Sequence, residues 1–299
     1  VHSKMNTLGG AVLSGLNKAF DLAESSYKGL VIGNQGAQFS AGANLAMIFM
    51  LATEGEWEEL DFAVRYFQKS VMRVRYSGIP VVVAPHGLSL GGGCEMSLHA
   101  DAVQAAAETY TGLVEVGVGL IPGGGGTKEM TKRASERYVK DDVELNALRE
   151  YYLTIGMAKV ATSAHEAFEL GLFQNGKDQI SVSKQRQITD AKQKVLLLAD
   201  LGYSPPVGKT IKVLGRQALG MFEAGAHAMQ EGGYISEHDR LISSKLAYIM
   251  SGGDLSEATE VSEQYLLDLE REAFLSLCGE RKTLERIQHR LKTGKPLRN

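Results

Sequence analysis

Residues 81–95 have the sequence VVVAPHGLSLGGGCE, in which an apolar run is followed by clustered glycines and one acidic residue. The run 81–84 is short and apolar, which predicts a buried strand. Residues 87–93 are predicted to form a glycine loop, and residues 94–100 a helix that begins at it. Because glycine has no Cβ, such a loop brings backbone N–H groups close to a ligand. The positive end of the helix dipole adds to this, so the stretch suits a negative charge.

The same strand, turn and helix order recurs on both sides of this stretch. Residues 28–33, KGLVIG, and residues 103–107 are predicted strands. Helical spacing of apolar residues predicts helices over the segments 7–26, 46–76 and 128–137. Alternating strands and helices are typical of the α/β class.

Beyond about residue 140 the pattern changes, because strand-like runs nearly vanish after residues 180–182. Helical spacing predicts helices over residues 186–201, 214–231, 236–251 and 261–291. We therefore expect two domains, an α/β core over residues 1–185 and a helical C-terminal appendage over residues 186–299.

The composition shows a local glycine surplus in an otherwise ordinary globular protein. Of 34 glycines in 299 residues, 11 lie within residues 87–126, and only six prolines are present. Such clustering argues against low complexity. The hydrophobic share of 44%, the charged share of 22% and the net charge of −3 are normal for a soluble protein. This charge gives no reason to expect a nucleic acid or an anionic membrane as partner.

The patterns of cysteine, histidine and serine exclude several classes of protein and of site. Two cysteines, Cys94 and Cys278, do not make a disulfide framework, which favours a reducing compartment and a cytoplasmic location. No spacing of His, Cys and Asp suggests a metal site, and no G-x-S-x-G motif marks a serine hydrolase. No apolar run reaches the ~18–20 residues that span a bilayer. The chain does not begin with Met, so it is expected to be a fragment.

Two glycine loops and two glutamates are the candidates for a catalytic site. Residues 123–127, GGGGT, lack the Lys of a phosphate-binding P-loop, and residues 91–93 do not form a G-x-G-x-x-G motif. An oxyanion hole with acidic partners remains. Glu95 lies in the first turn of a predicted helix and Glu115 in an apolar stretch. Each alone is also explained as a helix-start charge or an exposed residue, whereas a pair can manage a water molecule and its protons.

Three segments resemble the signature segments of the crotonase superfamily, the enoyl-CoA hydratases and isomerases. They are residues 39–45 (FSAGANL), 91–95 (GGGCE) and the tract from Glu115 to Thr127. The resemblance covers about residues 5–180, and it implies a spiral of ββα units with a helical C-terminal region that trimerises. The first one or two strands of the family would precede Val1. The whole chain also resembles the C-terminal hydratase part of bacterial bifunctional proteins that join it to a 3-hydroxyacyl-CoA dehydrogenase.

The resemblance implies a role for each matching position. Ala43 and Gly92 would provide the oxyanion-hole N–H groups, and Glu95 and Glu115 would be the catalytic acids. The remaining positions would contact an acyl-CoA thioester substrate: Ala41, Gly42, Asn44, Leu45, Gly91, Val114 and Gly123. Asn44 stands where the family usually has Asp. No cofactor and no metal are expected in this chain, and NAD would be needed only by an upstream dehydrogenase domain.

These roles imply hydration of trans-2-enoyl-CoA to 3-hydroxyacyl-CoA in fatty-acid β-oxidation by a homo-oligomer, because isomerases generally keep only one of the two acids. A Δ3-Δ2-enoyl-CoA isomerase is the first alternative. A non-catalytic assembly module, with the extra helices as its docking surface, is the second.

Overall fold

A computed structural model describes residues 4–139 and 141–299, and these form two compact units. Unit 1 combines the described residues up to Asn44 with Arg65–Leu113 and Val160–Val207. Unit 2 combines Leu45–Val64, the described residues of Val114–Lys159, and Gly208–Asn299. The domain boundary expected near residue 185 stays a prediction, since compactness does not show which segments fold independently.

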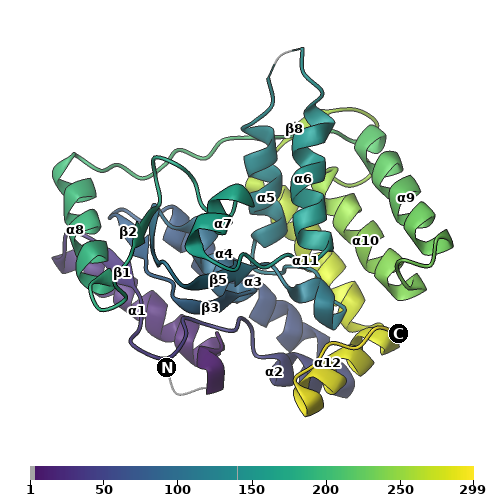
Figure 1. The fold of residues 1–299 in the computed structure, drawn as a ribbon, viewed down its shortest axis with the longest axis horizontal. Helices are drawn as coiled ribbons and strands as arrows, with labels where there is room; N and C mark the ends of the chain where they lie inside the picture. Colours follow the sequence, from purple (N-terminus) through teal and green to yellow (C-terminus); the bar gives the residue numbers. More distant parts are fainter. Residues whose placement is uncertain (1–3, 140) are drawn as a thin grey trace. The chain divides into compact units, whose positions relative to one another are not determined.

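Unit 1 contains a four-stranded parallel sheet with the order β1-β2-β4-β6. Its strands are β1 (Leu30–Ile32), β2 (Val81–Val83), β4 (Ala102–Ala106) and β6 (Gln179–Ser181). A second parallel pair joins β3 (Gly87–Leu90) to β5 (Thr109–Gly112), and the two lie side by side in Figure 1. The predicted α/β class is therefore confirmed, and the structure shows that its sheet is parallel.

Successive strands of unit 1 alternate between the two sheets, which produces the expected spiral. Strand β2 lies in the first sheet and β3 in the second, before helix α4 (Gly92–His99). Strands β4 and β5 repeat this alternation. Upstream, β1 lies in the first sheet and Ser40 forms a parallel bridge to Ser89 of β3. The backbone therefore makes three comparable turns of the spiral.

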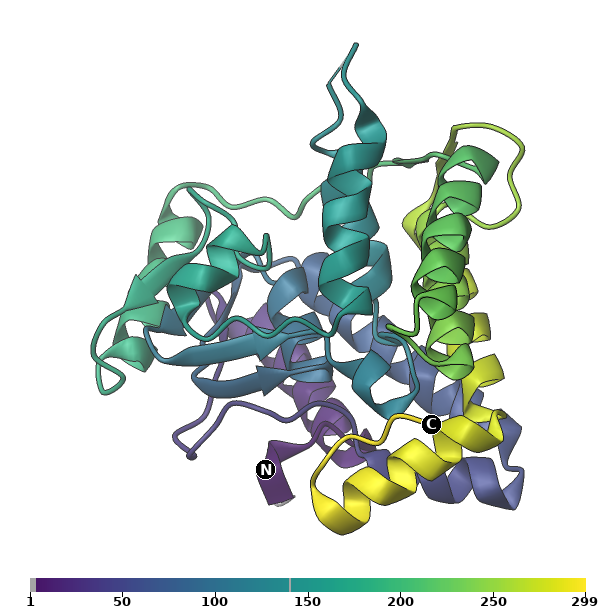
Figure 2. The same cartoon turned by 45° about the vertical axis from the view of Figure 1, so that its right-hand side comes forward.

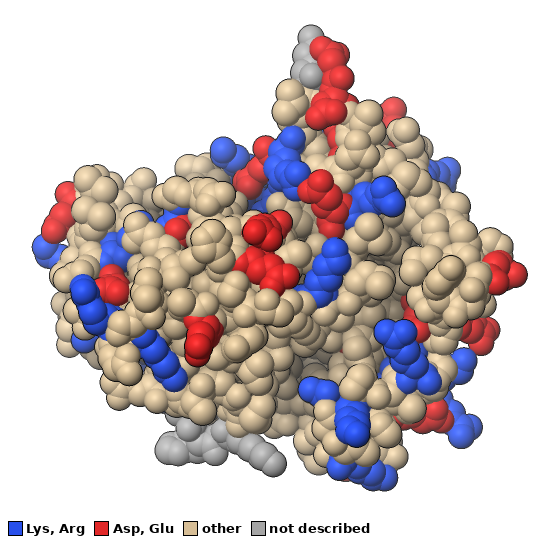
Figure 3. Space-filling view, viewed as in Figure 1, with Lys and Arg blue, Asp and Glu red and all other residues tan. Residues whose placement is uncertain are grey.

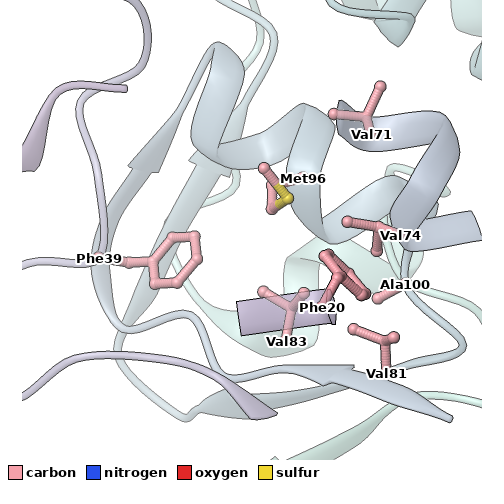
Figure 4. Close-up of a cluster of buried hydrophobic side chains, with 8 residues drawn as sticks. All are labelled: Phe20, Phe39, Val71, Val74, Val81, Val83, Met96 and Ala100. Carbon is pink, nitrogen blue, oxygen red and sulfur yellow. The ribbon is translucent and has the colours of Figure 1, made fainter. Parts of the chain in front are cut away.

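Helices cover both faces of the four-stranded sheet, which explains why all three residues of β2 are fully buried. On one face, α1 (Gly10–Ser26), α4 and the C-terminal part of α3 (Trp57–Arg75) supply side chains to a core cluster. Figure 4 shows its members, Phe20, Phe39, Val71, Val74, Val81, Val83, Met96 and Ala100. On the other face, α8 (Gln187–Asp200) packs Ala191 and Val195 against Val82. The short α7 (Ala164–Glu169) follows an antiparallel bridge from Thr111 to Ala161.

Unit 2 is mainly helical. It contains α2 (Leu45–Glu54), the 3-10 helix η2 (Glu115–Val118), α5 (Gly126–Ser135), α6 (Glu144–Gly156), α9 (Arg216–Glu231), α10 (Glu237–Met250), α11 (Glu263–Cys278) and α12 (Arg281–Thr293). Helix α12 lies beside α2 in both views of the ribbon (Figures 1 and 2). A short antiparallel pair, β7 (Ile211–Val213) with β8 (Thr259–Val261), was not expected from the sequence.

Several predicted boundaries shift for identifiable reasons. The helix expected over 46–76 is two helices, because Gly55 adopts φ 76° and the Glu56 N–H bonds back to the Leu51 carbonyl at 2.9 Å. The helix expected over 261–291 is broken after Cys278, where Glu280 has an extended backbone. Residues 87–90, expected as loop, form strand β3 because they pair with β5.

Surface charges of both signs are interspersed on the face shown in Figure 3, in keeping with the net charge of −3. Lys and Arg gather over α12, whose sequence RKTLERIQHRLKT carries five of them.

None of the helices in residues 4–139 and 141–299 has the length and apolar content that crossing a bilayer requires.

Candidate active site

The first signature segment, residues 39–44, lies in unit 1 beside β3, to which Ser40 forms a parallel bridge. The Phe39 N–H donates to the His86 carbonyl at 2.8 Å, and the Ser40 N–H to the Leu88 carbonyl at 3.0 Å. The Leu90 N–H donates back to the Ser40 carbonyl at 2.9 Å. Regular pairing of this kind fixes the register of the segment against the first glycine loop.

The N-terminal residues hold the other edge of the same segment. The Ala41 N–H donates to the Met5 carbonyl at 3.1 Å, and the Leu8 N–H to the Gly42 carbonyl at 2.8 Å. Leu8 was expected inside the first helix, but it forms a parallel bridge to Ala43, so α1 begins only at Gly10. The segment is therefore held on both sides by backbone hydrogen bonds.

Gly42 and Gly92 come into close backbone contact at the end of this segment. Gly42 has φ 94°, and a Cβ placed on it would lie 3.1 Å from the Gly92 nitrogen. A Cβ placed on Gly92 would lie 3.5 Å from the Ala43 nitrogen. Within the described part of the chain, neither the Ala43 N–H nor the Gly92 N–H donates a hydrogen bond. Two backbone N–H groups without an acceptor in the described residues therefore lie near one another, and an oxyanion hole requires such a pair.

The turn before α4 sets the direction of that helix. Gly91 adopts φ 52° and ψ −121°, a conformation that favours glycine, and its N–H donates to the Gly112 carbonyl at 2.9 Å. Phe39 and Met96 both enter the core cluster of Figure 4. The hydrophobic core therefore holds the 39–44 segment and α4 at once.

Glu95 lies in the first turn of α4 and is only 2% exposed. Its N–H donates to the Gly91 carbonyl at 2.9 Å. The Nδ1 atom of His99 lies 2.7 Å from the Glu95 carbonyl oxygen and must carry the proton, because a carbonyl only accepts. Glu95 thus occupies a helix start, where the dipole favours a carboxylate, and it does so as a buried side chain.

Glu115 opens the 3-10 helix η2 in unit 2 and is partly buried. The Leu120 N–H donates to the Glu115 carbonyl at 3.0 Å, which closes the turn. Gly119 ends η2 with φ 87°. The backbone at Glu115 is therefore held in a short hydrogen-bonded turn that only a residue tolerant of positive φ can end.

The second glycine loop holds an internal carboxylate. The Glu270 side chain accepts hydrogen bonds from the Gly125 N–H at 2.5 Å and the Lys128 N–H at 3.0 Å, and it is fully buried. These are N–H groups at the start of α5, where a helix favours a negative charge. Phe274 packs against Gly123, where a Cβ would lie 2.7 Å from the ring. This loop uses its backbone donors to bind α11 within unit 2, in agreement with the absence of a P-loop motif.

A network of buried charges continues from this loop. Lys128, fully buried, bonds to Glu263 at 2.7 Å and to Glu129 at 3.2 Å. Arg133 bonds to Glu129 at 3.3 Å. Each charge has a partner of opposite sign, as burial requires, so these residues serve the packing of α5 on α11.

The structure groups the predicted site residues by unit. Ala41, Gly42, Ala43, Asn44, Gly91, Gly92 and Glu95 all belong to unit 1, where hydrogen bonds join their segments. Leu45, Val114, Glu115 and Gly123 belong to unit 2, at the start of α2, at η2 and in the second glycine loop. Glu270 and the N-terminal partner Leu8 were missed, because no local pattern marks a contact across so many residues. Among the described residues, no group of three His, Cys, Asp or Glu side chains could hold a metal ion.

A parallel spiral of this kind defines the crotonase fold. The crystal structure of an enoyl-CoA hydratase from Bacillus halodurans is similar with a TM-score of 0.63 and 18% identity, covering 95% of this chain and 91% of that chain. A sequence model described as enoyl-CoA hydratase/isomerase matches residues 2–147. Residues 2–147, just under half of the chain, are thus similar to the enoyl-CoA hydratase/isomerase family of the crotonase superfamily.

Two curated relatives are longer than this chain. A protein of Bacillus subtilis (strain 168) named "Probable 3-hydroxyacyl-CoA dehydrogenase" is 49% identical over 298 residues, which is 100% of this chain and 37% of that protein. A "Putative fatty acid oxidation complex trifunctional enzyme" of Rickettsia felis is 39% identical over 134 residues, 45% of this chain and 19% of that protein. The chain therefore spans little more than a third of the first relative and less of the second.

Proposed function

We propose that the chain adds water to a trans-2-enoyl-CoA to give the 3-hydroxyacyl-CoA, as a step in fatty acid oxidation. The observation that carries this proposal is the close approach of Gly42 to Gly92, beside the available N–H groups of Ala43 and Gly92. Two neighbouring N–H donors suit an oxygen that gains negative charge. A thioester carbonyl becomes such an oxygen when a nucleophile adds to its conjugated double bond.

In the proposed reaction the thioester oxygen accepts hydrogen bonds from the Ala43 and Gly92 N–H groups. Water adds its oxygen to Cβ while one glutamate takes the proton that the water loses. The other glutamate gives a proton to Cα, so that the enolate collapses to the product. Loss of one oxyanion donor typically costs about 10²–10³ in rate. The reaction consumes only water and the acyl-CoA, so we propose that it needs no cofactor.

Glu95 and Glu115 are the proposed acids. Glu95 is buried on the helix that begins at the oxyanion-hole glycine, and Glu115 has a hydrogen-bonded backbone turn of its own. Retention of both acids supports hydration over isomerisation, since moving a double bond needs no second group to manage water. The name of the Rickettsia felis relative supports a place in fatty acid oxidation. A cytoplasmic homotrimer that uses the C-terminal helices remains part of the proposal.

The test is the loss of crotonyl-CoA absorbance on adding the purified protein. Glu95→Gln and Glu115→Gln are each expected to lower kcat by at least about 10²-fold. Glu59→Gln, an exposed change in the first turn of α3, is the matched control and should leave kcat unchanged. A folded wild-type protein that does not hydrate crotonyl-CoA would refute the proposal. Conversion of a 3-enoyl-CoA to the 2-enoyl-CoA without hydration would establish the isomerase instead.

A further inference from the structure

Helix α12 contacts the turn that follows Glu115 through one buried hydroxyl group. The Thr283 Oγ1 donates a hydrogen bond of 2.8 Å to the Gly119 carbonyl oxygen, and Thr283 is fully buried. Both residues belong to unit 2, although 164 positions separate them in the sequence. A buried carbonyl that loses its donor pays a desolvation penalty, so this bond ties the turn to the helix.

The approach of Gly119 to Thr283 leaves no room for a side chain. A Cβ on Gly119 would lie 2.9 Å from both the Cα and the Oγ1 of Thr283. Gly119 also has φ 87°, which disfavours any residue with a side chain. Glycine at this position therefore allows both the backbone conformation of the turn and its contact with α12.

His238, at the start of α10, supports Thr283 from the other side. Its Nε2 atom lies 2.9 Å from Thr283 Oγ1, and His238 is 3% exposed. The Thr283 hydroxyl proton is used toward Gly119, so Oγ1 accepts the proton of His238 Nε2–H. The histidine therefore fixes the rotamer in which Thr283 donates to the turn.

Backbone hydrogen bonds in the turn connect Gly119, which Thr283 holds, to the backbone of Glu115. The Gly119 N–H donates back to the carbonyls of Glu115 and Val116, and the Leu120 N–H donates to Glu115. Thr283 is thus connected to the Glu115 backbone through Gly119 and one short hydrogen-bonded turn. A shift of Gly119 away from α12 would move the Glu115 backbone with it.

We propose that Thr283 and His238 are positioning residues for Glu115: they hold the Glu115–Leu120 turn against α12 and thereby set the carboxylate for proton transfer. This inference rests on the proposed function, in which Glu115 is one of the two acids. In this proposal neither Thr283 nor His238 contacts the substrate. Misplacement of a catalytic group by about 1 Å can cost about 10²-fold in rate.

Kinetics of Thr283→Val measure the catalytic consequence, because valine keeps the shape and removes the hydroxyl. We expect kcat for crotonyl-CoA to fall about 10- to 100-fold while KM stays within about twofold. Thr283→Ser keeps the donor and should recover most of kcat. Thr131→Val is the matched control, since the buried Thr131 hydroxyl bonds to the Thr127 carbonyl at the same 2.8 Å on α5. Unchanged kcat in Thr283→Val, or an equal loss in Thr131→Val, would overturn the inference.

Amide hydrogen exchange measures the anchoring independently of activity. The Gly119 and Leu120 amides should exchange at least about 10-fold faster in Thr283→Val, and not in Thr131→Val. Unchanged exchange would overturn the inference even if wild type has no hydratase activity, which would by itself refute only the proposed function. Should Thr283→Val not fold, His238→Leu removes the support alone and should speed the same amides by about 3- to 10-fold.

Discussion

A Cβ atom on Gly42 would lie 3.1 Å from the backbone nitrogen of Gly92 and 2.9 Å from the Leu90 carbonyl oxygen. Two loops that lie 50 residues apart in the sequence therefore meet backbone to backbone. Neither contact can relax by moving a flexible side chain, so the positions of Ala43 and Gly92 are coupled. Perturbing one loop must displace the other.

This coupling predicts the effect of Gly42→Ala. The methyl group meets backbone atoms and the residue must keep φ 94°, so the unfolding free energy should fall by about 1–3 kcal/mol. Hydration of crotonyl-CoA should lose at least about 10-fold in kcat/KM, because the two donors separate. Gly15→Ala is the control, since Gly15 lies exposed within α1 with open space around it, and it should gain about 0.5–1 kcal/mol. Equal stabilities of the two variants in urea would contradict the coupling.

Glu270 is predicted to be a major support of unit 2. Glu270→Gln turns an amide NH₂ toward one of two backbone donors, Gly125 N–H or Lys128 N–H, and removes a buried charge from the start of α5. The unfolding free energy should fall by about 2–4 kcal/mol. Asp200→Asn, which breaks only the exposed ion pair to Lys28, should change it by less than about 0.5 kcal/mol. Urea denaturation measures the unfolding free energy of both variants. The prediction is contradicted if Glu270→Gln lowers it no more than Asp200→Asn does.

Two buried histidines predict a fall in stability toward acid pH. Burial lowers the pKa of His86, and burial together with the nearby Arg286 lowers the pKa of His238. Below the ordinary histidine pKa of 6.5 the unfolded chain binds protons that the native protein does not, so stability is present above 6.5 and falls as pH drops toward the native values. Urea midpoints at about pH 5.5 should lie below those at about pH 7.5. Replacing both histidines by Asn should reduce that difference, and identical midpoints in wild type would refute the assignment.

Cysteine reactivity should report the integrity of the fold. Cys94 and Cys278 are both buried, and burial raises the pKa of the Cys278 thiol to about 12. The thiolate is the reactive form, so a thiol reagent at neutral pH should label the native protein slowly. Denaturant should expose two thiols that react at once. Rapid labelling of Cys278 in the native state would show that the end of α11 opens readily.

The local parts of the fold follow from sequence patterns. Apolar runs at residues 28–33 and 81–84 predict β1 and β2, and helical spacing predicts α8, α9 and α10 within two residues of their ends. Breaks such as Gly55 were missed, because helical spacing of apolar residues continues across them. Strands β7 and β8 have only three residues each, too few for a period-2 pattern to stand out.

The sequence by itself determined the α/β class, a glycine turn at the start of α4 and the placement of Glu95 in the first turn of that helix, because periodicity and backbone freedom are local properties. Only the tertiary structure decided that Gly42 meets Gly92, that Glu270 binds the second glycine loop across 145 residues, and that Thr283 holds Gly119. These contacts join segments whose own sequences are compatible with many partners. The chain chooses among those partners by burying apolar surface and by pairing each buried polar group, which no single segment can do alone.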